Sequence, residues 1–303
     1  MTTKTPFDQF VLVNIELSAY SGLAALPENC LKEDYEKKIV SSGNMEVVPA
    51  EELKIFATLR ARARNSCLAV GTSFCGGYAV PTQKWVELQE NLNTIMADFE
   101  SYADHFIASY PHLVEKQASA WPTNAKIIRS IAQDPEWIAT RFSASYSAAF
   151  LQPAPGMEDA LVKQVQGMEE TLLSEIALDA KAAIRAHNKG SKITRKMKST
   201  LYSMLDKLRG LAFLGDQTEG LAITLQAQLD VLEVPFSQSG PLSTETQSQI
   251  ATLLIAMSDP DNLRDLSAVL KIQHSKQAQS RTCAPASSIH HPIQQDTEEL
   301  FFL

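Results

Sequence analysis

The chain has 303 residues, of which 45% are hydrophobic, and a formal net charge of −8. Its length and apolar content allow one elongated domain or two smaller ones with a sizeable core, and its acidic balance excludes a protein whose whole surface binds nucleic acid. The four cysteines contain no CxxC pair, which argues against a zinc site or a disulfide framework. Because the start is not signal-like and no apolar run could span a bilayer, we expect a cytoplasmic protein.

The first predicted element is a half-buried strand from Phe10 to Leu17, where apolar residues, several of them β-branched, alternate with others. The charged segment 31–40 is typical of a short helix or turn, and a second short strand is predicted at 45–48. A helix follows Pro49 and extends to about Val70, because large apolar residues recur at helical spacing and acidic residues occupy the first turn.

A glycine-rich loop, GTSFCGGYAVP at 71–81, follows this helix. Glycines can bring backbone amides close to a phosphate, but the lysine and hydroxyl of a P-loop are missing. The loop therefore favours a tight turn that folds one long helix back against the next, in which Gly76 and Gly77 adopt positive φ or lie against another backbone.

The next helix carries a heptad seam, in which large side chains recur alternately three and four residues apart. We predict this helix from about Thr82 to Tyr110, where Pro111 interrupts it. The seam consists of Trp85, Leu88, Leu92, Ile95, Phe99, Tyr102 and Phe106.

The segment from 124 to 150 reads as a short helix at 124–132, a helix start at Asp134–Pro135 and an ambiguous stretch, RFSASYSAAF. The large residues of that last stretch fit either strand alternation or a repeat of every fourth residue. We favour a strand, because the strand at 10–17 needs a partner for its backbone groups.

After Pro153 the pattern becomes purely helical. Helices are predicted at about 157–187, from Ser191 to about 211, at 216–232 with Asp216 and Glu219 as a capping box, at 244–257, and from Asp259–Pro260 onward. The polar segment from 273 onward predicts disorder. The predicted fold is mainly α, with long coiled-coil-like helical hairpins and a small antiparallel β element. Its parts are an N-terminal strand with a helical hairpin at 1–152, a helical bundle at 153–272 and a tail at 273–303.

Two features are candidates for binding. Nine basic residues between 181 and 209 are opposed only by Asp206, so this hairpin tip is either a solvated helix end or a docking site for an acidic partner or a phosphate backbone. The apolar end of the polar tail is a candidate anchor, which docks either on a partner or on the protein itself. The candidate contact residues are Lys189, Lys192, Arg195, Lys196 and Lys198 at the tip and Leu300, Phe301, Phe302 and Leu303 in the tail.

Sequence motifs for chemistry are missing. HExxH, nucleophile-elbow and Walker patterns do not occur, and His105 with His112 has no further ligands nearby. The sequence therefore predicts no catalytic residue, no metal, no cofactor and no enzyme activity.

The succession VLVNIELSAYSG, GTSFCGGYAVP, RFSASYSAAF and LDKLRGLAFLGD resembles an uncharacterised bacterial domain-of-unknown-function family found on conjugative elements, plasmids and phages. The likeness covers roughly residues 8–235 and is most specific at 71–81. It implies genes for a MoxR-type AAA+ ATPase, similar to the cobalt-chelatase small subunit, and for a von Willebrand-type protein nearby. The first hypothesis is thus a non-enzymatic adaptor or scaffold for these partners. The alternative, based on the basic tip, is a nucleic-acid-associated accessory protein of a mobile element.

Overall fold

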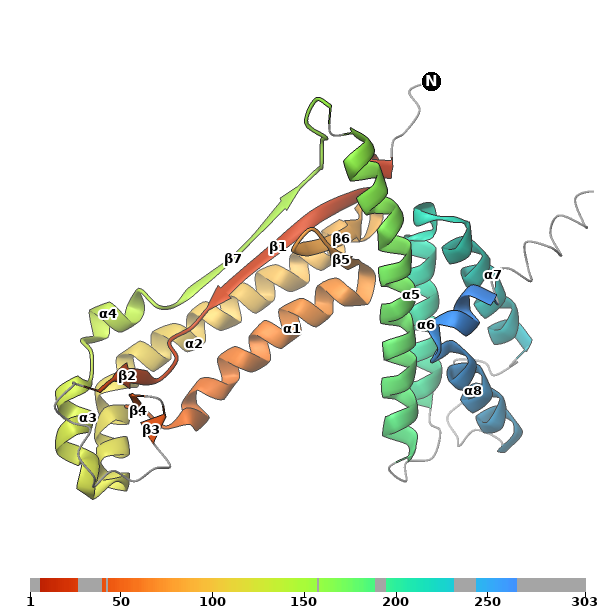
Figure 1. The fold of residues 1–303 in the computed structure, drawn as a ribbon. Helices are drawn as coiled ribbons and strands as arrows, with labels where there is room; N and C mark the ends of the chain where they lie inside the picture. The colour runs from red at the N-terminus through yellow and green to blue at the C-terminus, as the bar shows by residue number, and fades with distance from the viewer. Residues whose placement is uncertain are drawn as a thin grey trace, which may run out of the picture.

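The computed structural model describes residues 6–26, 40–41, 43–156, 158–188, 195–231 and 244–265. Two parts meet at an angle (Figure 1): an arm of two long helices with a β-sheet, and a body of packed helices. The fold is mainly helical with a small antiparallel sheet, which confirms the predicted class. None of the helices in these described ranges combines the length and the apolar character needed to cross a membrane.

The sheet of the arm has the strand order β5-β6-β1-β7, and all its pairs are antiparallel. β1 (Phe10–Ser18) pairs with β6 (Gly77–Pro81) at its start and with β7 (Ser143–Ala149) over most of its length. The ambiguous stretch is therefore a strand, as predicted. β1 buries alternate apolar side chains against the helices, because successive residues of a strand point to opposite faces.

The glycine-rich loop is a β-hairpin, not only a turn: β5 (Thr72–Phe74) pairs with β6. Cys75 and Gly76 have φ of 48° and 78°, which is the left-handed pair that a two-residue hairpin turn needs. Gly77 lies against β1, because an added Cβ would stand 2.5 Å from the Val13 carbonyl oxygen. The hairpin still folds α1 (Lys54–Val70) back against the following helix α2, as expected.

α2 spans Trp85–Ala120, so the predicted stop at Tyr110 is wrong. Pro111 lies inside the helix with its side chain exposed, and the turns after it bury Leu113, Val114 and Ala118. This burial offsets the lost hydrogen bond that normally makes proline a helix breaker. Most of the predicted seam is buried, but Tyr102 is 46% exposed.

The far end of the arm holds the short elements. β2 (Leu23–Ala25), β3 (Val40–Ser41) and β4 (Asn44–Glu46) form a second small sheet, which confirms a strand near Met45. The charged segment 31–39 lies outside the described residues. α3 (Ala125–Ile131) and α4 (Pro135–Ala139) pack on α2. Within the described residues, single 3-10 turns lie at Pro6–Gln9, Ala50–Leu53, Thr82–Lys84, Pro122–Asn124 and Ala212–Leu214.

The body consists of α5 (Glu158–Asn188), α6 (Arg195–Gly210), α7 (Asp216–Val231) and α8 (Thr244–Met257), with a further helical segment at 260–265. Each helix predicted for this half has a counterpart among the described residues, and the predicted parts at 191–194, at 232 and beyond 265 lie outside them. The amide of Thr218 in the first turn of α7 donates to the Glu169 carboxylate of α5, 2.8 Å away. Another helix thus satisfies an amide that helix geometry leaves open.

Two hydrophobic cores hold the molecule together. The core of the arm joins β1 to α1 and α2 and contains an aromatic cluster in which the Phe56 ring lies 5.1 Å from Phe99 and 4.9 Å from Phe142. The core of the body also takes in the end of the arm's sheet, because Phe10 stacks on Phe213 at 6.1 Å and meets the Phe74 ring edge-on at 5.7 Å. The sheet is therefore packed into both parts.

Candidate interaction surface at the junction

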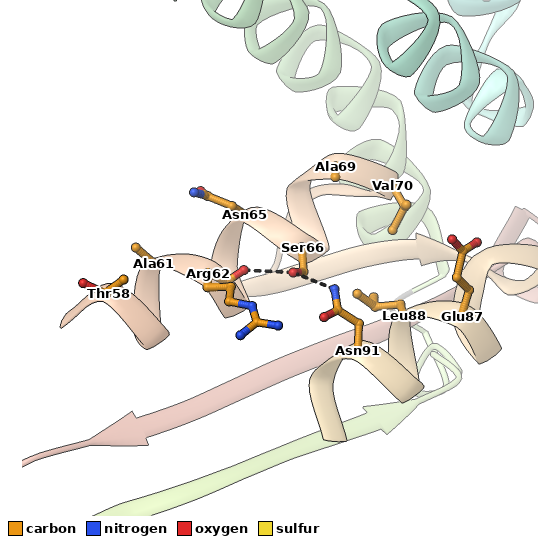
Figure 2. Close-up of a pocket in the computed structure, with 10 residues that line it drawn as sticks. All are labelled: Thr58, Ala61, Arg62, Asn65, Ser66, Ala69, Val70, Glu87, Leu88 and Asn91. Atoms are coloured by element: carbon orange, nitrogen blue, oxygen red, sulfur yellow. Dashed lines mark hydrogen bonds between the residues drawn. The ribbon is translucent and has the colours of Figure 1, made fainter. Parts of the chain in front are cut away.

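A groove of about 850 Å³ lies between α1 and α2 (Figure 2). Mainly small and polar side chains line it, and Leu88 and Val70 are its larger apolar residues. The lining residues are Thr58, Ala61, Arg62, Asn65, Ser66, Ala69 and Val70 of α1 and Glu87, Leu88 and Asn91 of α2.

A hydrogen-bond chain fixes this groove across the two helices. The Asn91 side-chain amide donates to Ser66 Oγ at 3.0 Å, and Ser66 Oγ donates to the Arg62 carbonyl at 2.9 Å (Figure 2). Arg62 also forms an ion pair of 3.0 Å with Asp98 of α2. These contacts hold α1 and α2 at a set spacing, which gives the groove a preformed shape.

A second groove of about 480 Å³ lies where α1 meets α5 and α6. A smaller hollow of about 210 Å³ connects the neighbourhood of Glu87 with that of Lys207. Ala69 lines all three hollows, and Asn65 lines the two larger ones. We call this continuous region, centred on the exposed side of α1 from Asn65 to Val70, the junction surface.

A buried ion pair lies beneath the junction surface. Lys207 of α6 donates to Glu175 Oε2 of α5 at 3.0 Å, and their side chains are 3% and 17% exposed. The other oxygen, Oε1, accepts the backbone amide of Ser73 at 3.1 Å and its hydroxyl at 2.9 Å. One carboxylate thus ties the hairpin of the arm to two helices of the body. Nearby, burial raises the pKa of Asp179, although the charge of Lys207 opposes this shift.

Burial also raises the pKa values of one thiol and one phenol near the junction. Burial raises the pKa of the Cys67 thiol to about 12, which makes it a poor nucleophile at neutral pH. Burial also raises the pKa of Tyr78, against the charge of Arg64. Among the described residues, no group of three or more His, Cys, Asp or Glu side chains is placed to hold a metal ion.

The residues predicted from the sequence as contacts lie mostly outside the described structure. Lys189, Lys192 and the tail residues Leu300, Phe301, Phe302 and Leu303 lie outside it. The first turn of α6 contains Arg195, Lys196 and Lys198, but their side chains are not described. Of the other basic residues, Lys181 and Arg185 are exposed on α5, whereas Lys207 is buried in its ion pair. The structure therefore reduces the exposed basic cluster by one charge and leaves the predicted contacts as predictions.

Sequence reasoning did not find the junction surface. A signal was present: on the outer side of α1, alanines and short polar residues occupy positions that solvated helices usually fill with long charged side chains. That pattern identifies a face that a partner can approach closely, but not which elements surround it.

Comparison with known proteins gives one match. The family model described as "Protein of unknown function (DUF3150)" matches residues 7–259. No curated protein and no solved structure matches the chain.

Proposed function

We propose a role in a multiprotein assembly, starting from one premise: the chain belongs to the DUF3150 family of proteins of unknown function. The protein serves as a non-enzymatic adaptor or scaffold subunit for a MoxR-type AAA+ ATPase and a von Willebrand-type protein, in a cytoplasmic system encoded by a bacterial mobile element. The partners come from the resemblance described above. The docking site that we assign to them is the junction surface.

One observation carries this assignment: helices of both the arm and the body contribute to the junction surface. A partner bound there contacts both parts at once and fixes the angle between them. The exposed side chains at its centre are small, so a partner helix can approach α1 closely, and polar groups at its rim offer hydrogen bonds. An adaptor needs such a surface, whereas an enzyme needs convergent reactive groups.

Substitution of Ala69 tests the assignment. Ala69→Arg places a long cation at the centre of all three hollows, and because Ala69 is exposed, folding is preserved. We expect co-purification of the AAA+ ATPase from nuclease-treated extract to fall about tenfold or more, which corresponds to about 1.4 kcal/mol.

The matched control is Ala57→Arg, because Ala57 is another exposed alanine of the same helix and lines none of these hollows. It should leave co-purification unchanged. Equal recovery of the ATPase with both variants would exclude the junction surface as the docking site. Failure to recover the ATPase or the von Willebrand-type protein with the unmodified chain would refute the adaptor role itself.

A nucleic-acid-associated role is the second candidate. Lys181 and Arg185 are exposed on α5 and continue the predicted basic tip along that helix. If the tip binds a phosphate backbone, duplex binding should weaken steeply as salt increases, because counterions are released on binding. It should also be lost when Lys192, Arg195, Lys196 and Lys198 are reversed to Glu. Binding that survives these four reversals would refute this candidate.

A further inference from the structure

β7 forms an edge of the sheet in the arm. Its pairing partner is β1, and within the described residues no strand pairs with its other side. Figure 1 shows β7 at the rim of the arm, with no labelled element beyond it. Such an edge presents a row of backbone donors and acceptors that another strand can pair with.

Side chains cap backbone groups at the other exposed parts of this sheet. The opposite edge, β5, has only three residues, and its Ser73 amide donates to Glu175 of the body. On the part of β1 that extends beyond β6, Arg60 caps one carbonyl: its Nε donates to the Leu17 carbonyl oxygen at 3.0 Å. The open edge of β7 therefore differs from the rest of the sheet.

β7 also lacks the features with which proteins protect an edge strand. Its seven residues, SASYSAA, include no lysine, proline or other blocking charge, and no bulge interrupts its register with β1. The nearest preceding charge, Arg141, lies over the Trp137 ring at 4.0 Å. The strand is thus long enough, and neutral enough, to accept a partner strand.

The sequence of the strand identifies that partner. The stretch FSASYSAAF at 142–150 reads almost the same in both directions about Tyr146. In antiparallel pairing of two copies about Tyr146, serine meets serine or alanine, alanine meets alanine, and phenylalanine meets phenylalanine. Opposing residues share a face of the sheet, so the side chains on each face match in size and no like charges are opposed.

An exposed aromatic side chain supports the same register. Phe150 is 64% exposed directly after β7, which is unusual for a residue of this size. In the symmetric register it lies opposite Phe142 of the second copy, whose ring belongs to the aromatic cluster of the arm. The pairing thus gives an apolar neighbour to a side chain that the single chain leaves in water.

We propose that two copies of this protein associate through β7, antiparallel and centred on Tyr146, so that their two four-stranded sheets become one continuous sheet. The interface is isologous, with each copy contributing the same strand. This inference does not depend on the proposed adaptor role.

A charge exchange tests the register. Ser145 lies opposite Ser147 of the second copy, and both are exposed. One variant carries Ser145→Lys with Ser147→Lys, and the other carries Ser145→Glu with Ser147→Glu. Two copies of the same variant place like charges opposite each other. In an equimolar mixture, a Lys copy that pairs with a Glu copy places each Lys opposite a Glu. Both variants carry Glu16→Gln, because Glu16 neighbours Ser145 on β1. The Glu16→Gln single variant is the reference, and circular dichroism checks the fold.

Sedimentation equilibrium of the full chain measures the outcome. We expect twice the monomer mass for the unmodified protein and the reference, the monomer mass for each double variant alone, and a return to twice that mass in the mixture. The control Ser248→Lys with Thr252→Lys, exposed positions on α8, should behave like the unmodified protein. A monomeric unmodified protein at about 100 µM, or double variants that still dimerise alone, would overturn the proposal.

Discussion

Lys207 is the position where a single substitution should reveal how the arm is joined to the body. Lys207→Met keeps most of the side-chain length but removes the charge that pairs with Glu175. Glu175 then keeps only the two hydrogen bonds from Ser73, and Asp179 loses the favourable charge nearby. The carboxylates of the junction are left without a buried counter-charge.

The burial of the pair sets the size of the effect. Removing one partner of a buried ion pair costs about 3–5 kcal/mol. Glu175 is 17% exposed and retains its bonds to Ser73, so we expect the lower end, about 3 kcal/mol of unfolding free energy. Adding Glu175→Gln removes the second charge but keeps an oxygen acceptor for Ser73, and the double variant should lose only about 1 kcal/mol.

Urea unfolding followed by circular dichroism measures these differences, because the free energy of unfolding falls linearly with urea. The control is the surface pair of Lys116 and Glu52, 2.8 Å apart with side chains 55% and 36% exposed. Lys116→Met should change stability by less than about 0.5 kcal/mol. If Lys207→Met costs no more than this control, the buried pair does not hold the junction together.

Three further predictions concern the arm and the junction. Leu92→Asp, at a fully buried seam position, should lower unfolding free energy by about 4 kcal/mol, and an unchanged melting temperature would mean that the seam is not core. Gly77→Val should cost more than about 2 kcal/mol, because its side chain meets the Val13 carbonyl; a urea midpoint equal to that of the unmodified protein would contradict this. Asp179→Asn should raise the melting temperature at neutral pH. Because folding raises the pKa of Asp179, ionisation of its carboxyl group opposes folding as pH rises through that pKa. The gain in melting temperature should therefore vanish below the ordinary pKa of 3.8. A gain that persists at that pH would refute burial of the charged carboxylate as its cause.

Much of the arm could be predicted because its buried side chains make apolar residues recur at regular intervals in the sequence. The alternation in β1 and the heptad spacing in α2 each report which face is covered. The same local logic failed at Pro111, because the packing of the next two turns against distant residues outweighs the local preference of proline. It also missed the pairing of β5 with β6, since a three-residue strand is too short to show a period.

The junction surface could not be predicted, because residues far apart in the sequence create it. Lys207 counts as one of several exposed cations in the sequence, but Glu175, 32 positions earlier, makes it a buried structural residue. Ser73, which shares that carboxylate, is 102 positions from it. A charge run on a helix shows which residues are basic, whereas only the fold shows which of them face solvent.

The two proposed interfaces use different residues of the arm. The junction surface is centred on α1 and includes Glu87, Leu88 and Asn91 of α2, whereas the pairing uses the open backbone edge of β7. Because no residue of β7 lines the junction surface, we expect the pairing to leave that surface accessible in each copy, so that a symmetric pair presents it twice. The opposite edge of the sheet, β5, is not open in the same way. Because Glu175 caps Ser73 from the body, the sheet cannot extend in that direction, and association through strand edges stops at two copies. A closed pair with two docking surfaces fits an adaptor better than an open filament, whose growth would bury or crowd the partner sites.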